Sequence, residues 1–176
     1  MAIAGVSVQP NDLQTVAVPL ILAYDILGIL GLFLLLLVLS TAWFSARVPR
    51  ASTWFLLIIS AIVVNLSSLL LVGHQSSPDH NKTACFVQAV TVYPSMVLNN
   101  FAAVAFLLQV YLSMIKMNKR SESCSLTSTQ VRLLHAIPIF MAGSLLVVTL
   151  VVGVNDPSLV GREPSGLQCH MNYLVM

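Results

Sequence analysis

Apolar residues fall into four long runs along the chain, separated by short polar stretches. The runs extend approximately from Leu20 to Phe44, from Thr53 to Gly73, from Phe86 to Ile115 and from Leu133 to Val154. A helix that crosses roughly 30 Å of hydrocarbon needs about 20 mainly apolar residues, and each run is long enough. None of the runs alternates between polar and apolar positions, as barrel strands would. The pattern predicts an all-α bundle of four membrane-spanning helices, 20–44, 53–73, 86–115 and 133–154, in one transmembrane domain over residues 1–176.

The composition agrees with a lipid environment. Hydrophobic residues make up 57% of the 176 positions and charged residues only 8%, against about 25% charged in a soluble domain. Asp25 is the only formally charged residue inside the four runs. The net charge of +2 is too small to indicate nucleic acid, so we expect the lipid bilayer as a partner and no nucleic-acid partner.

The basic residues predict the orientation of the helices. Six of the eight flank two loops, 45–52 and 116–132: Arg47, Arg50, Lys116, Lys119, Arg120 and Arg132. The others are Lys82 and Arg162, and the first 19 residues contain no Lys or Arg. Because cytoplasmic loops carry the excess of positive charge, both basic loops are expected inside. The amino terminus, the loop 74–85 and the tail 155–176 are then expected outside.

A glycosylation triplet and two cysteines lie in segments expected to be outside. Asn81-Lys82-Thr83 precedes Cys85, and Cys169 lies in the tail, whereas Cys124 falls in an inner loop. Cys85 and Cys169 are thus the pair that shares an oxidising compartment, and we predict a disulfide between them. Two free or intermolecularly paired thiols are the alternative. Glycan occupancy at Asn81 stays open, because a site this close to the bilayer can lie out of reach of the transferase.

These features together resemble the first four helices of a seven-transmembrane, G protein-coupled receptor-like protein. The shared features are an outer amino terminus, a cysteine opening a long third helix, a basic inner loop and a second outer cysteine after helix four. The stretch 85–114, with Cys-x-x-Gln-Ala at one end and Leu-Gln-x-aromatic-Leu near the other, is also similar to third helices of receptor-like proteins from mushroom-forming fungi. The resemblance implies a multi-pass protein of the plasma membrane with an extracellular ligand.

The chain departs from the best-known receptor class at the inner end of the third run. An acidic-Arg-aromatic triplet there helps such receptors hold and release a G protein, and its place falls on Gln109, Val110 and Tyr111. Only the aromatic member matches, so the usual inner ionic latch is missing. The resemblance therefore rests on topology and the cysteine pair, and coupling by that device is in doubt.

Polar side chains inside a membrane each need an explanation. Asp25 lies about five residues into the first run, shallow enough to reach the outer interface, although it could also face a ligand or an ion. Asn65, Asn99 and Asn100 lie near the middle of the second and third runs, where amides most often bond neighbouring helices. A direct ligand role is the alternative. Pro94 favours a kink in the third helix, which either opens an outward cavity or improves packing.

Catalysis finds no support in the sequence. No nucleophile with a paired base and no metal-ligand spacing occurs, and no Lys lies inside a run to hold retinal. We therefore expect no enzyme, no metal site and no cofactor. The basic residues around 116–132 set topology by touching anionic lipid, and docking of a G protein is an optional further role.

Three functions remain open at this point. The first is the amino-terminal half of a receptor-like signalling protein, unable to signal as a four-helix fragment, which predicts three more spans after Met176. The second is a four-span scaffold or adaptor that assembles with partners. The third is a small transporter subunit, which would move a solute in vesicles.

Overall fold

The computed structural model describes residues 10–44, 51–70, 72, 82–118, 127–162 and 169–171. Its helices are α1 (Pro10–Phe44), α2 (Ser52–Leu69), α3 (Lys82–Asn118) and α4 (Ser128–Asn155), followed by the 3-10 turn η1 (Pro157–Leu159) and the strands β1 (Val160–Arg162) and β2 (Cys169–Met171). Within these residues, four helices are long and apolar enough to cross a membrane. The predicted all-α fold is confirmed, and the chain is a multi-pass integral membrane protein.

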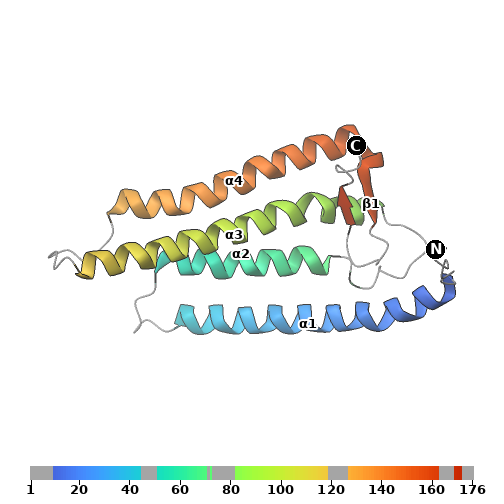
Figure 1. Ribbon diagram of the computed structural model, residues 1–176, viewed down its shortest axis with the longest axis horizontal. Coiled ribbons are helices and arrows are strands. Elements are labelled where there is room, and N and C mark those ends of the chain that lie inside the picture. Colours follow the sequence, from blue (N-terminus) through green and yellow to red (C-terminus); the bar gives the residue numbers. More distant parts are fainter. Residues whose placement is uncertain are drawn as a thin grey trace, which may run out of the picture.

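The four helices lie side by side in chain order and alternate in direction (Figure 1). The main contacts join α1 to α2, α2 to α3 and α3 to α4. We call the end that holds β1, β2 and the start of α3 the hairpin end, and the end that holds Phe44, Ser52 and Ser128 the far end. Since the helices follow one another in a row, α1 and α4 each leave a broad apolar surface open to lipid.

The observed helices extend beyond the apolar runs at most of their ends. α1 begins at Pro10 rather than at residue 20, α3 at Lys82 rather than at 86, and α4 at Ser128 rather than at 133. At the start of α4, the backbone N–H of Thr127 donates to Gln130 Oε1 at 3.3 Å, which is one half of a capping box. An apolar run marks only the part of a helix that lies in hydrocarbon. The polar turns at the ends of these helices therefore lie outside the predicted ranges.

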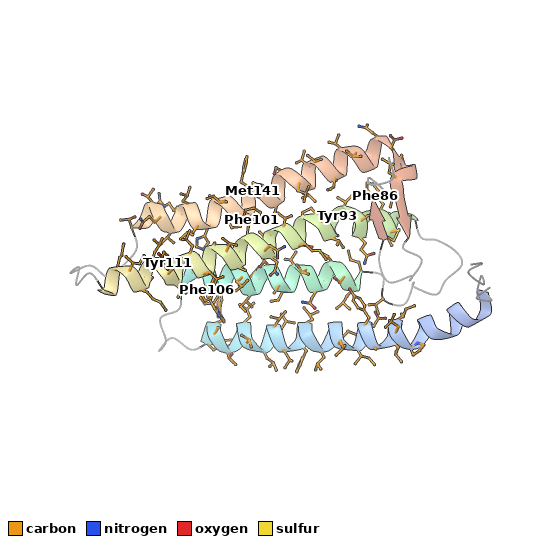
Figure 2. All side chains as sticks on the ribbon, in the orientation of Figure 1. Phe86, Tyr93, Phe101, Phe106, Tyr111 and Met141 are labelled. Carbon is orange, nitrogen blue, oxygen red and sulfur yellow. A yellow bond between two sulfur atoms is a disulfide. The ribbon has the colours of Figure 1, made fainter. Side chains whose placement is uncertain are left out.

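A small antiparallel hairpin, which the sequence did not predict, forms in the tail after α4. Val160 pairs with Met171 and Arg162 pairs with Cys169. The hairpin lies against the first turns of α3, close to Phe86 and Tyr93 (Figure 2). The tail after α4 therefore forms a cap on α3.

Small and hydroxyl-bearing residues line the contacts between helices. α4 turns a stripe of buried residues towards α3: Leu134, Pro138, Ala142, Thr149 and Gly153. On α3, Ala102 is 0% exposed and Ala105 is 5% exposed. Such side chains let helix backbones approach closely, which is the usual basis of packing between membrane helices.

Candidate functional site

A disulfide joins the start of α3 to the hairpin, as the sequence predicted. Cys85 and Cys169 are bonded with their Cα atoms 5.3 Å apart, across a sequence separation of 84 residues. Both are buried, and Ala89 and Val90 complete a cluster around them. The bond therefore fixes the segment after α4 to α3 at the hairpin end.

Gln88, one turn after Cys85, connects three elements at the same end. Its side chain is 0% exposed. Its Nε2 atom donates to the carbonyls of Ser67 and Ser68 at 3.4 and 3.3 Å, and its Oε1 atom accepts from the backbone N–H of Cys169 at 2.9 Å. The carboxamide thus holds α2, α3 and β2 together. The sequence shows a glutamine one turn after a cysteine that was predicted to be bonded. It does not show which groups the Gln88 side chain bonds.

Two further polar contacts join α2 to α3, one in the middle of α2 and one near the far end. The hydroxyl of Ser60 lies 3.1 Å from Asn99 Oδ1, and the hydroxyl of Thr53 donates to Gln109 Oε1. Thr53 and Ser60 are both 0% exposed. Together with buried Ser67 they recur every seven residues of α2, which keeps them on the side that faces α3. This stripe of hydroxyls was not recognised in the sequence.

The three intramembrane asparagines occupy three different environments. Asn99 contacts Ser60 across the α2–α3 interface. Asn65 donates from Nδ2 to the carbonyl of Ala61 on its own helix at 2.9 Å, and its Oδ1 atom faces α1, because a Cβ atom added to Gly31 would lie 3.6 Å from it. Asn100 is exposed on α3. Neighbouring positions in the sequence therefore have different surroundings.

Pro94 is buried, and its missing N–H is compensated by α4. A proline leaves the carbonyl four residues earlier without its helical partner, which here is the carbonyl of Val90. The Thr149 hydroxyl lies 3.4 Å from that carbonyl, as well as 3.0 and 3.1 Å from the carbonyls of Leu145 and Leu146 on its own helix. The structure thus places Pro94 in a packed contact between α3 and α4.

The position of the receptor triplet contains no ion pair. Gln109 is half-buried and bonded to Thr53, Val110 is half-buried, and Tyr111 is 61% exposed. A neutral amide in contact with a hydroxyl cannot act as a charge-dependent latch. This segment therefore joins α3 to α2 by a neutral hydrogen bond.

The charged residues that the structure describes lie near helix ends, in α1 or in β1. Asp25 is half-buried in α1, Lys116 lies in the last turn of α3, and Arg132 is exposed within α4. Arg47, Arg50, Asn81, Lys119 and Arg120 lie outside the described residues. Among the described residues, no group of three or more His, Cys, Asp or Glu side chains could hold a metal ion.

An open cavity of about 330 Å³ lies towards the far end, where α1, α2 and α3 meet. Val38 and Thr41 line it from α1, Ala51 and Trp54 from the start of α2, and Phe106 from α3. The lining is mainly apolar and carries no charged side chain, so the cavity suits an apolar group.

Comparison of the chain with models of protein families, with curated proteins and with solved structures finds no match in any of the three. The class of the protein therefore rests on its own geometry. That geometry defines an integral membrane protein of four apolar helices with a disulfide-bonded cap on α3.

Proposed function

We propose that this chain forms the amino-terminal helices of a seven-transmembrane, G protein-coupled receptor-like signalling protein of the plasma membrane. The observation that carries the proposal is the disulfide between Cys85 and Cys169, which ties the segment after α4 onto the start of α3. This is the cysteine arrangement on which the resemblance to such receptors rests. The β1–β2 hairpin is then part of the outer surface, where a ligand would be received.

The proposal includes an orientation, with the hairpin end outside. The disulfide needs an oxidising compartment, and six of the eight basic residues lie in the segments that connect α1 to α2 and α3 to α4 or in the helix turns next to them. Positive residues near the far end favour the cytoplasmic side. The two arguments use different residues and agree on the same orientation.

By itself the four-helix chain does not couple to a G protein and is no enzyme. Gln109, at the acidic position of the receptor triplet, accepts a neutral hydrogen bond from Thr53, and Val110 occupies the Arg position, so neither member of the ionic latch carries a charge. Coupling would also need the inner surface that further helices provide. The function of this segment is therefore to form the outer cap and one wall of a larger bundle.

Glycosylation of Asn81 tests the orientation. We expect the chain translated into microsomes to gain one glycan, because Asn81 then lies in the lumen, and Asn81→Gln to remove it. Gel mobility with and without glycosidase measures the change. Since an unmodified Asn81 can also reflect its closeness to the membrane, a second chain carries a glycosylation triplet between Arg47 and Arg50. A glycan on that second site would contradict the orientation.

Reading the full-length transcript through the codon after Met176 tests the receptor assignment. An open frame with three more apolar runs is expected, because a receptor-like bundle needs seven helices. A stop codon there, together with stable protein in the membrane, would contradict the assignment.

A second candidate, a four-span scaffold that assembles with partner proteins, is favoured by one observation. Asn100 lies exposed on an apolar face of α3, in the middle of a membrane span. Exposed amides at that depth drive association between helices. A stop codon after Met176 would favour this function.

A further inference from the structure

One face of α3 is covered near the hairpin end and uncovered over the rest of the helix. Near its start, Ala89 is 0% exposed and Tyr93 packs against the cluster around the disulfide. Further along the same face, six residues are exposed in the described structure, and we call them the open face of α3: Met96, Asn100, Val104, Leu107, Tyr111 and Met114. Its apolar members and Tyr111 are between 43% and 64% exposed. Neither α2 nor α4 reaches this face.

The open face has the spacing of a helix-pairing seam. From Asn100 to Met114 its members follow one another at intervals of four, three, four and three residues. At about 100° per residue, all six side chains point within roughly 40° of Asn100. A hydrophobic repeat of 3.5 residues is the pattern by which two helices pack in a left-handed crossing, and left-handed crossings are the commonest in membrane bundles.

Asn100 is the polar member of this seam. It lies in the middle of the candidate span Thr83–Lys116. Its neighbour Asn99 has Ser60 as a partner, whereas the Asn100 side chain has no hydrogen bond among the described residues. A polar group without a partner is costly in hydrocarbon, because no water replaces the missing bonds. The carboxamide offers two donors and one acceptor oxygen to a second helix.

We propose that two copies of this chain pair along the open face of α3, with the two Asn100 side chains hydrogen-bonded to each other. Copies inserted by the same mechanism have the same orientation, so their α3 helices run parallel. A twofold axis along the membrane normal then places each residue of the face opposite its own copy. The carboxamide both donates and accepts, which makes it complementary to itself, and a single Asn in an apolar seam fixes a parallel register.

A second copy fits better than an unrelated helix because it supplies the required amide at the required depth. The open face is apolar apart from Asn100 and the hydroxyl of Tyr111, so it carries no charge that would select an oppositely charged partner. The inference rests on the second candidate function, the four-span scaffold, because the further helices of a receptor-like bundle would cover the open face of α3. The transcript test decides the receptor assignment separately, so the failure of one proposal is distinguishable from the failure of the other.

Energy transfer between labelled copies in liposomes tests the pairing. The whole chain is reconstituted with donor- and acceptor-labelled copies, and the dissociation constant is measured as a mole fraction in lipid. Asn100→Leu is expected to weaken pairing about tenfold, because each lost membrane hydrogen bond contributes a few-fold or more. Asn100→Gln keeps an amide and should retain part of the affinity. Ser144→Leu on the exposed side of α4 is the matched control and should leave affinity unchanged.

Cysteine cross-linking locates the interface. In a background of Cys124→Ser with the native disulfide intact, Val104→Cys and Leu107→Cys should give oxidised dimers, whereas Val148→Cys on the exposed face of α4 should not. The proposal is overturned if the chain stays monomeric in lipid, if Asn100→Leu pairs as tightly as the original chain, or if cross-links form through α4. Cross-linking of Val104→Cys to a different polypeptide in native membranes, without dimers, would equally overturn it.

Discussion

Serine and threonine hydroxyls in the spans form their hydrogen bonds in two ways. Ser40, Thr41 and Ser144 donate to carbonyls of their own helix and are half-buried or exposed. The hydroxyls that reach a neighbouring helix, Thr149 among them, are buried. Because a serine or threonine can always bond its own helix backbone, these residues cost little in lipid and add specificity only where a second helix is close.

The contact between Thr149 and the Val90 carbonyl predicts a coupling with Pro94. We expect Thr149→Val to lower the free energy of unfolding by about 0.5–1 kcal/mol. In a Pro94→Ala background the restored N–H supplies the Val90 carbonyl, so the same change should cost less. Unfolding titrations of the four proteins measure the coupling. Equal costs in both backgrounds would mean that Thr149 bonds only its own helix.

At the scale of elements, α1 packs closely against α2 at two glycines of α1. A Cβ atom added to Gly28 would lie 3.0 Å from Leu69 Cδ2, and one added to Gly31 would lie 3.6 Å from Asn65 Oδ1. The glycines are three residues apart and face residues four apart on α2. The absence of side chains at these points is what lets α1 lie close to its neighbour.

Replacing Gly28 with a branched side chain should separate α1 from α2. We expect Gly28→Ile to lower the free energy of unfolding by about 1–3 kcal/mol, because the added atoms overfill the contact with Leu69. Gly143→Ile is the matched control, since a Cβ atom there meets nothing within 4 Å. Thermal unfolding of the two variants in detergent gives the comparison. Equal shifts would show that helix propensity, not packing, sets the outcome.

The sequence predicted the elements better than their ends. The four spans were predicted from the length of the apolar runs. The disulfide was predicted because the order of the spans and the charges of the loops place Cys85 and Cys169 on the same side of the membrane. The starts of α1 and α4 lie in polar stretches, which the search for apolar runs does not include. The start of α4 could have been predicted from Thr127 and Gln130, which have the spacing of a capping box. The different surroundings of Asn99 and Asn100 could not be predicted, because they depend on which helices lie alongside α3.

For the whole molecule, the hairpin end is where the segment after α4 is joined to α3, and where α3 is joined to the end of α2. Two bonds hold β2 against α3: the disulfide binds the Cys169 sulfur, and the Gln88 side chain accepts a hydrogen bond from the Cys169 backbone N–H. Both contacts join residues far apart in the chain; the sequence predicted the disulfide, whereas only the folded structure reveals the contact between Gln88 and Cys169. Stability at this end should therefore depend on one buried amide as well as on the covalent bond.

We expect Gln88→Leu to destabilise the protein by about 1–3 kcal/mol, because the buried N–H of Cys169 and two carbonyls of α2 lose their partner. The Cys85–Cys169 bond should also be reduced faster by dithiothreitol, since the strand is held less firmly. Ser144→Leu also replaces a polar side chain by leucine, at an exposed position of α4 whose hydroxyl bonds its own helix, and is the control. Unchanged stability and unchanged reduction rate would show that the disulfide alone holds the hairpin.

The disulfide also has a consequence for biosynthesis. Cys169 follows Cys85 by 84 residues, which at about 5–20 residues per second is synthesised some 4–17 seconds later. α3 and α4 lie between the two cysteines, so these residues reach the same side of the membrane only when both helices have crossed it. In the proposed orientation, with the hairpin end in the secretory lumen, a chain whose α4 failed to insert would keep a free thiol on Cys85, available to thiol-dependent retention in that compartment. Closure of this bond thus reports that α3 and α4 have both been inserted.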